Sequence, residues 1–345
     1  TKEEVIAYFK DFTKIVHKDG MVVSGDCNSE LFHRLGATET DLSVFKEIGV
    51  DILRMDFSFN DERDATLINN KEGIKIEMST SFIEIIEAAI KNGAKPENIS
   101  TCHNFYPERY TAPSLEAINE INNYWKAKNI PVAIFISSLV KGSHGPWPVS
   151  DGLPTIEEHR DMPIGEQLKH CLALDNVDEI IIGNAYASED EFKAIDQVMK
   201  QVYVDVPKNE AFGFLADFIP HGMVKRVPFK IQLEEGITEL EKEILFNYPT
   251  HSDLGDCMNY MLRSRWTRMI YKGKEIPCRP CTKTHYTRGD VVIVNDNLAH
   301  YRGEIQIVLK DMKVDGQRNL LGRIDESELF ILEHIKAKDV FTFVE

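Results

Sequence analysis

The stretch Ile52-Leu53-Arg54-Met55-Asp56-Phe57 predicts a short β-strand with two unlike faces. Successive side chains of a strand point to opposite sides, so its odd-numbered residues share one apolar face that we expect to pack against helices. Arg54 and Asp56 share the other face with Ile52. Burying a guanidinium and a carboxylate is costly unless they are paired or have a function. This face is therefore either a structural Arg–Asp bridge or part of a site.

Runs of this kind alternate with amphipathic helices as far as about residue 215, which is the pattern of βαβ units in a parallel sheet. The predicted strands are Met21–Asp26, Asp51–Phe57, Ile74–Ser79, Ile99–Phe105, Pro131–Ser138 and Glu179–Asn184. The predicted helices include Thr1–Lys18, Thr40–Glu47, Ser81–Asn92, Ser114–Lys128 and Ile164–Leu174. Ser188 and Glu191 have the spacing of a capping box, so a further helix is expected to begin there.

We predict a (β/α)8 TIM-type barrel, which needs eight strands to close. Because six strands are visible and a helix precedes the first, the first two strands would lie upstream of residue 1. The alternative is an open, doubly wound sheet of six strands. That fold usually carries a Gly-x-Gly-x-x-Gly or Walker loop after its first strand, and the sequence has neither.

The pattern changes after about residue 215, where β-rich runs follow one another without long crossover helices. These runs are Phe229–Leu233, Asp290–Asn295, Gly303–Leu309 and Asp339–Val344. They predict a compact β-barrel or sandwich. We therefore expect two domains, a (β/α) barrel at 1–215 and a small β domain at 216–345.

Composition narrows the class of partner. The 345 residues carry a net charge of −16, which argues against nucleic acid or an anionic membrane as the main partner. No apolar run approaches the roughly 18–20 residues that span a bilayer, and no leader opens the chain, so a cytoplasmic location is expected. Cys278 and Cys281 with His285 are too few for a zinc site, and neither a metal nor a cofactor is predicted.

The candidate site residues lie at the carboxyl ends of the predicted strands, where (β/α) barrels place their active sites. Lys75 and Glu77 share the inward face of the third strand. Alternation does not decide whether His103 or Asn104 faces inward, and a buried, structural histidine is as good an interpretation as a functional one. The other candidates are Asp26, Tyr106, Trp147 in the long loop 141–160, Asn184, Tyr186 and Ser188.

Several longer motifs resemble one bacterial family, the 6-phospho-N-acetylmuramidases of peptidoglycan recycling, also called outer-surface-protein-like. The motifs are Cys102-His103-Asn104-Phe105-Tyr106-Pro107, the segment Gly152–Arg160, Ile181–Ser188, Gly303–Ile307 and the closing Phe341–Glu345. The resemblance covers essentially the whole chain. It implies a (β/α)8 barrel followed by a cyclophilin-like β domain. It also implies hydrolysis of 6-phospho-N-acetylmuramyl-N-acetylglucosamine in the cytoplasm.

Glycoside hydrolysis normally uses two carboxylates across the scissile bond. We expect Asp56 and Glu77 to be the working pair, with Asp26 positioning the sugar or replacing one of them. Attack by the 2-acetamido group of the substrate is an open alternative. We expect Arg54, His103 and Asn104 to bind hydroxyl, lactyl or phosphate oxygens. The 6-phosphate is expected near Asn184–Ser188, at the N-terminus of the last helix of the barrel.

Two other functions remain open at this point. An aldolase acting on a sugar phosphate would need an inward lysine for a Schiff base, and Lys75 is such a residue. A non-catalytic carbohydrate-binding surface protein would need no converging carboxylates. The sequence leaves open whether the chain forms a homo-oligomer.

Overall fold

The computed structural model describes residues 2–146, 148, 151–256 and 259–345. The chain divides into two compact units, Thr1–Met162 with Asn176–Ala187, and Pro163–Asp175 with Ser188–Glu345. This division differs from the boundary that we expected at residue 215. The helices α7 (Ile164–Leu174) and α8 (Glu189–Val202) belong to the β-rich unit. An ion pair between Lys169 and Glu328 ties α7 to this unit.

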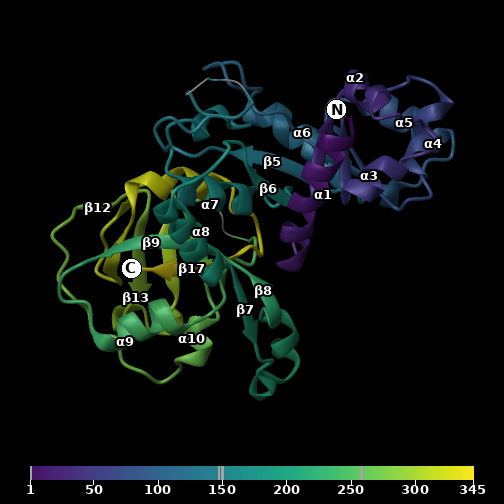
Figure 1. The fold of residues 1–345 in the computed structure, drawn as a ribbon. Helices are drawn as coiled ribbons and strands as arrows, with labels where there is room; N and C mark the ends of the chain where they lie inside the picture. The colour runs from purple at the N-terminus through teal and green to yellow at the C-terminus, as the bar shows by residue number, and fades with distance from the viewer. Residues whose placement is uncertain (1, 147, 149–150, 257–258) are drawn as a thin grey trace. The chain divides into compact units, whose positions relative to one another are not determined.

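The first unit is built on a curled parallel sheet of six strands in the order β1-β2-β3-β4-β5-β6 (Figure 1). All six predicted strands are present, each somewhat shorter than expected. Their bounds are Ser24–Cys27, Ile52–Met55, Lys75–Ser79, Ile99–Cys102, Val132–Ile136 and Glu179–Ile182. In the described ranges β1 and β6 each have one neighbour, so the sheet is a half-barrel. The predicted closed TIM-type barrel is not confirmed.

Helices pack against one face of this sheet and bury its apolar side chains. Leu53 and Met55 are buried in this core with Phe32 and Trp125, as the alternation in the second strand predicts. The sequence pattern did not identify two of the helices, α2 and α4. The helices of this unit are α1 (Lys2–Lys18), α2 (Ser29–Arg34), α3 (Ser43–Ile48), α4 (Glu62–Ile68), α5 (Ile83–Lys91) and α6 (Leu115–Lys126).

The second unit is built on a seven-stranded, nearly closed sheet in the order β10-β17-β9-β16-β13-β14-β11. Their bounds, in that order, are His251–Ser252, Val340–Val344, Val227–Leu233, Arg318–Ile324, Asp290–Val294, Ile305–Val308 and Met261–Ser264. Between the end strands β10 and β11, His251 Nδ1 lies 2.9 Å from Ser264 Oγ. The inward side chains form an apolar core that includes Phe229, Ile293 and Phe341. This confirms a barrel-like β unit.

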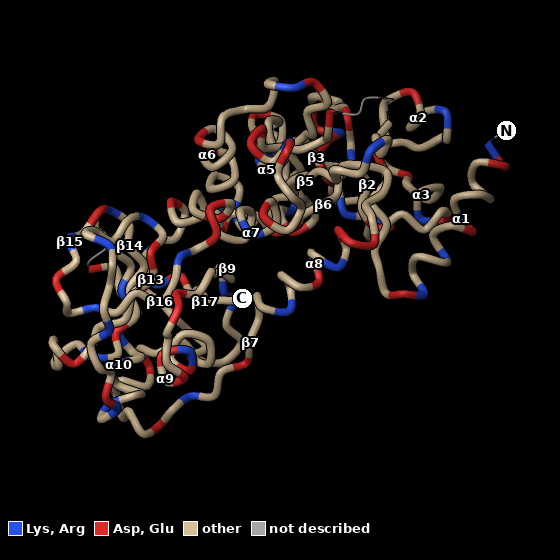
Figure 2. The backbone as a smooth tube through the Cα atoms, turned by 90° about the vertical axis from the view of Figure 1, so that its left-hand side faces the viewer, with Lys and Arg blue, Asp and Glu red and all other residues tan. Residues whose placement is uncertain are grey.

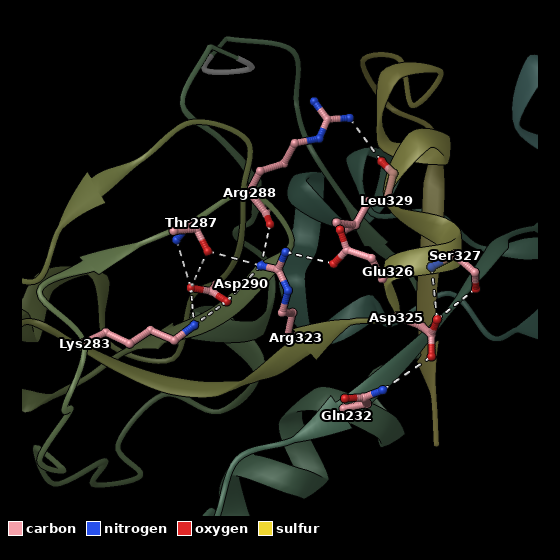
Figure 3. Close-up of polar contacts among 10 residues, drawn as sticks. All are labelled: Gln232, Lys283, Thr287, Arg288, Asp290, Arg323, Asp325, Glu326, Ser327 and Leu329. Carbon is pink, nitrogen blue, oxygen red and sulfur yellow. Dashed lines mark hydrogen bonds and ion pairs between the residues drawn. The ribbon is translucent and has the colours of Figure 1, made fainter.

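A polar network closes one turn of this unit (Figure 3). Asp290 is fully buried, and both of its carboxylate oxygens accept from Lys283 Nζ at 2.8 Å. Arg323 lies 3.4 Å from the same carboxylate and donates to the carbonyl of Arg288 at 2.6 Å. Because this buried carboxylate is paired with two cations, the network is structural.

The second unit also contains parts that the pattern did not predict. A two-stranded hairpin is formed by β7 (Tyr203–Val206) and β8 (Gly222–Lys225). A second small ladder pairs β12 (His285–Tyr286) with β15 (Met312–Lys313), and α9 (Glu239–Lys242) and α10 (Thr267–Ile270) are single turns. The predicted capping box of Ser188 and Glu191 is confirmed at the start of α8. None of the helices in the described ranges has both the length and the apolar character that a bilayer span requires.

Candidate active site

Charged residues occupy neighbouring positions on one face of the first sheet. The strand register aligns Asp26 on β1 with Arg54 on β2, and Arg54 with Glu77 on β3. Aligned residues of adjacent strands point to the same side, so the three side chains form a row across the sheet. Asp56 lies two residues beyond Arg54 and joins this face at the carboxyl edge. Figure 2 shows acidic positions, in red, among these strands.

Arg54 is the centre of the row. Its Nη1 lies 3.6 Å from Glu77 Oε1, and its Nη2 donates to Asn104 Oδ1 at 2.9 Å. Both terminal nitrogens also approach the carbonyl of His103, at 3.4 and 3.5 Å. The guanidinium carbon lies 5.8 Å from the ring centre of Phe135. Arg54 is thus contacted by Glu77, Asn104 and the carbonyl of His103. Asn104 lies at the site, as predicted.

Glu77 lies deep in the row, with 3% of its surface exposed. Burial raises the pKa of its carboxyl, the charge of Arg54 opposes that rise, and the negative charges of Glu179 and Asp26 add to it. The ion pair with Arg54 occupies one of its oxygens. Glu77 therefore faces the guanidinium, and little of its surface is open to a bound molecule.

Asp26 and Asp56 differ from Glu77 because both side chains are exposed. Their strands are adjacent, and the backbone N–H of Asp56 donates to the carbonyl of Cys27 at 3.1 Å. Partial burial of its carboxyl group raises the pKa of Asp26, the nearby charge of Asp56 and a side-chain hydrogen bond to it also raise it, and Arg54 opposes the rise. The structure therefore brings together all three predicted carboxylates, but it exposes only this pair.

Sequence reasoning missed a fourth carboxylate, Glu179. It opens β6 in register with Ala133 of β5, and its charge acts on Glu77 and on the thiol of Cys102. Burial, as the largest cause, raises the pKa of Cys102 to about 12, so this thiol stays protonated. The sequence did carry a signal for Glu179, because it is the one charged residue of β6, whose other residues are isoleucines.

Lys75 does not lie at the same edge. It is the first residue of β3, in register with Ile52, and its backbone N–H donates to the carbonyl of Asp51 at 2.9 Å. Its position is therefore at the amino end of the strand, whereas Asp56 lies at the carboxyl end. This placement argues against Lys75 as a Schiff-base nucleophile beside the carboxylates.

His103 is not brought to the charged face. It is 3% exposed, with Nδ1 at 3.2 Å from Thr80 Oγ1 and Nε2 at 2.6 Å from Asn122 Oδ1 on α6. Burial, as the largest cause, lowers the pKa of its imidazole. Both ring nitrogens are thus satisfied within the helix layer. The structure therefore places the His103 ring away from the charged face, and Asn104 is the neighbour whose side chain contacts Arg54.

The residues predicted for phosphate binding are engaged in holding loops. The Asn184 side chain accepts from the backbone N–H of Ser138 at 2.8 Å and donates to the carbonyl of Ser143 at 3.2 Å. Tyr186 is exposed, and its carbonyl accepts from the Ser143 hydroxyl at 2.7 Å. These contacts use the Asn184 side chain and the Tyr186 carbonyl to hold the segment 138–143.

Ser188 belongs to the second unit, where its hydroxyl accepts from the Glu191 N–H and its own N–H donates to Glu191 Oε2. The first turn of α8 carries Glu189, Asp190 and Glu191. Three carboxylates at a capped helix start repel an anion and occupy the donors that it would need. This arrangement argues against the predicted phosphate position at the N-terminus of α8.

The loop after β5 is fixed by a buried ion pair. Arg160 is 2% exposed and donates from Nε and Nη2 to both oxygens of Glu157, at 2.5 and 2.8 Å. Glu157 also accepts from the N–H of Tyr110 at 2.8 Å, and the bond from Arg160 is the main reason that its pKa falls to about 2. Tyr106 is tied to the same loop, because its N–H donates to the carbonyl of Pro154 at 3.0 Å. The predicted Trp147 lies outside the described residues.

No group of three or more His, Cys, Asp or Glu side chains within the described ranges could hold a metal ion. The chemistry that the charged face offers is that of exposed carboxyl groups beside a fixed guanidinium. Carboxyl groups of this kind can donate and accept protons or stabilise positive charge.

Two family models match the chain. One, described as 6-phospho-N-acetylmuramidase, N-terminal, matches residues 1–197, and the other, described as 6-phospho-N-acetylmuramidase, C-terminal, matches residues 227–344. The chain belongs to the 6-phospho-N-acetylmuramidase family. This family is one of glycosidases, so the protein is a glycosidase with the two domains of that family.

Two solved structures that are similar to this family member are described without an assigned function. One is described as an uncharacterized B. cereus protein, with 34% identity and a TM-score of 0.82, covering 98% of this chain and 88% of that chain. Another is a conserved protein of unknown function from Enterococcus faecalis, with 25% identity and a TM-score of 0.64, covering 98% and 84%. A search of the curated proteins found no match.

Proposed function

We propose that this glycosidase hydrolyses a phosphorylated amino-sugar disaccharide, 6-phospho-N-acetylmuramyl-N-acetylglucosamine, at the charged face of the first sheet. The observation that carries the proposal is the placement of exposed Asp26 and Asp56 beside a fixed arginine at the carboxyl edge of parallel strands. Family membership supplies the class of substrate. Cytoplasmic cell-wall recycling is the process in which such a substrate would be consumed.

Asp56 and Asp26 are the carboxylates that we propose for the chemistry, with Glu77 as the residue that holds Arg54. This revises the pairing of Asp56 with Glu77 that we expected from the sequence. The physical reason is access, since 3% exposure and an ion pair leave Glu77 little contact with a substrate. Arg54 and Asn104 are proposed to bind substrate oxygens, because charge-assisted hydrogen bonds to such oxygens are strong.

The proposal is tested by comparing the disaccharide with and without its 6-phosphate. Binding energy from a group remote from the scissile bond can be used in the transition state, so the phosphate should raise kcat/KM strongly. We expect hydrolysis of the phosphorylated disaccharide at a kcat/KM at least about 10²-fold above that of the unphosphorylated one. Equal values for the two substrates would reject the assignment to a phosphosugar.

The Asp56→Asn variant tests the location of the site. An amide of the same size removes the charge and leaves the packing unchanged, and loss of an acid or base group typically lowers the rate by about 10²–10⁴. The matched control is Asp11→Asn, which changes an exposed carboxylate on α1. Near-normal hydrolysis by Asp56→Asn would place the chemistry elsewhere in the chain.

A further inference from the structure

The strands β4 and β5 stop pairing before β5 ends. The backbone N–H of Thr101 donates to the carbonyl of Pro131 at 2.8 Å. Two residues further on, the N–H of His103 donates to the carbonyl of Ala133 at 3.0 Å. The next carbonyl that faces this side of β5 is that of Phe135, because every second residue of a strand bonds to the same neighbour. By then β4 has ended, so a different segment must supply the partner.

Thr155, in the loop after β5, supplies this partner. Its backbone N–H donates to the carbonyl of Phe135 at 3.0 Å, and its hydroxyl accepts from the N–H of Phe135 at 3.0 Å. The same hydroxyl donates to the carbonyl of Asn104 at 2.9 Å. The side chain is fully buried, and its hydroxyl uses both its donor and an acceptor lone pair. Thr155 thus fastens Asn104 to β5.

The contact between Asn104 and Arg54 depends on how the backbone of Asn104 is held. The side-chain oxygen of Asn104 accepts from Arg54 Nη2 at 2.9 Å. Asn104 is exposed and follows the end of β4, so neither burial nor the strand ladder fixes it. The preceding residue, His103, is held by hydrogen bonds to its ring. The bond from the Thr155 hydroxyl therefore holds the part of this segment that contacts Arg54.

We propose that Thr155 is a positioning residue for the proposed hydrolysis, in which its hydroxyl holds Asn104 against Arg54. The inference rests on the proposed function, since Arg54 and Asn104 act there as ligands of substrate oxygens. It adds the loop after β5 to the groups that serve the site. Thr155 needs no contact with the substrate, because ligands that are already held in place lose less conformational freedom when a substrate binds.

The decisive experiment removes the Thr155 hydroxyl and nearly keeps the volume of the side chain. In Thr155→Val both hydrogen bonds of the hydroxyl are lost, so Asn104 and Arg54 are held less firmly. We expect kcat/KM for the phosphorylated disaccharide to fall about 10-fold, with the fold checked by circular dichroism. Thr155→Ser restores the hydroxyl and should stay within about 2-fold of the wild-type value. If the valine variant does not fold, Thr155→Ala, which also lacks the hydroxyl, should show the same loss.

The matched control is Thr101→Val, the same substitution at another buried threonine next to β5. The Thr101 hydroxyl also donates to a carbonyl at 2.9 Å, but this carbonyl belongs to Pro131, just before the amino end of β5. Thr101→Val should lower the thermal stability while its kcat/KM stays within about 2-fold of the wild-type value. Equal losses of kcat/KM in Thr101→Val and Thr155→Val, or a wild-type value in Thr155→Val, would overturn the proposal.

A double variant shows whether Thr155 acts through Asn104. Residues that act as one unit have effects that do not add, so Thr155→Val should lower kcat/KM by less than about 2-fold when Asn104→Ala is already present. A further loss of about 10-fold in the double variant would contradict the proposal, because Thr155 would then act by another route. Failure of the wild-type protein to cleave the phosphorylated disaccharide would reject the proposed function itself, and this inference with it.

Discussion

At the scale of single residues, the buried Glu77 determines how Arg54 acts on the exposed pair. The guanidinium lies between a buried carboxylate and Asp26, and its charge opposes the rise that burial causes in the pKa of both. Glu77 therefore competes with Asp26 for the same cation. The negative charges of Glu77 and Asp26 also repel each other directly. Both effects add to the rise in the pKa of Asp26.

The Glu77→Gln variant should therefore change the pH profile more than it changes the maximum rate. Without the Glu77 charge, Arg54 acts fully on Asp26, and the pKa of Asp26 falls. If the protonated Asp26 is the acid, activity is lost as pH rises through this pKa, so the alkaline limb of kcat/KM should move to lower pH. We expect a shift on the order of one pH unit.

The control for this measurement is Glu87→Gln, which changes a partly exposed glutamate on α5 that pairs with Lys128. The alkaline limb of the kcat/KM profile of this variant should coincide with that of the wild-type protein. An unmoved limb in Glu77→Gln, or a shift to higher pH, would contradict the proposed competition for Arg54.

Residue roles were the least predictable part of the site. Period-two alternation correctly assigned Arg54, Asp56 and Glu77 to one face, because a strand has only two faces. It could not assign His103, since the residue follows the last paired position of β4, where the backbone leaves the ladder. It also could not tell that Glu77 is buried, because depth depends on neighbouring strands such as β6 with Glu179.

At the scale of elements, the loop after β5 depends on one buried pair. Arg160 bonds to both oxygens of Glu157 and to the carbonyl of Asp151 at 2.9 Å. Truncating Arg160 leaves the partly exposed Glu157 carboxylate and the carbonyl of Asp151 without their donor, which costs about 1–3 kcal/mol. Arg160→Ala should therefore lower the free energy of unfolding by about that amount, measured by urea denaturation at pH 7.

Arg63→Ala is the matched control, because Arg63 also pairs with an aspartate, but both side chains are about half exposed. Exposed pairs contribute about 0–1 kcal/mol. Similar losses in the two variants would contradict the structural role of Arg160. The Glu157 contribution also has a defined pH range. Its pKa is depressed to about 2, so its contribution is present above the usual value of 4.5 and is lost as pH falls through about 2.

Elements with a strong period were predicted well, and short ones were not. The six parallel strands and α7 were found because buried strands and amphipathic helices leave a clear hydrophobic pattern. The helix α2 has six residues and α4 has seven, too few for a helical period to stand out. The β7–β8 hairpin was missed because its strands, of four residues each, carry few buried side chains.

At the scale of the whole molecule, the order of β-α alternation followed by β-rich sequence predicted two units of different class. The alternation did not reveal which unit a helix joins. The helix α7 lies between β5 and β6 in the chain, yet its buried Lys169 pairs with Glu328 near the C-terminus. A contact between residues so far apart in sequence leaves no local signal.

The barrel-like unit should lose stability in mild acid because it buries neutral histidines. His251, the first residue of β10, is fully buried, with Nδ1 at 2.9 Å from the Ser264 hydroxyl and Nε2 at 3.0 Å from the carbonyl of Leu245. The carbonyl can only accept, so Nε2 carries the proton and the ring is neutral. Burial, as the largest cause, lowers the pKa of His251 to about 4 and that of His170 to about 3.

Because both histidine pKa values are lowered by folding, the folded state is less stable in acid. Unfolded histidines titrate near 6.5, so between pH 6.5 and 4 the unfolded chain takes up protons that the folded chain does not. Stability is therefore complete above about pH 6.5 and falls as the pH decreases, by about 1.4 kcal/mol per pH unit for each such histidine. We expect the midpoint of urea unfolding of this unit to decrease from pH 7 to pH 5.

His251→Gln should be less stable than the wild-type protein at pH 7, since the packing and one of the two hydrogen bonds are altered. Between pH 7 and pH 5, however, it should lose less stability than the wild-type protein, because a glutamine takes up no proton. His300→Gln changes an exposed histidine, and its free energy of unfolding should depend on pH as that of the wild-type protein does. If His251→Gln loses as much stability between pH 7 and pH 5 as the wild-type protein, His251 does not resist protonation in the folded state. The acid sensitivity would then have to arise from the carboxylates.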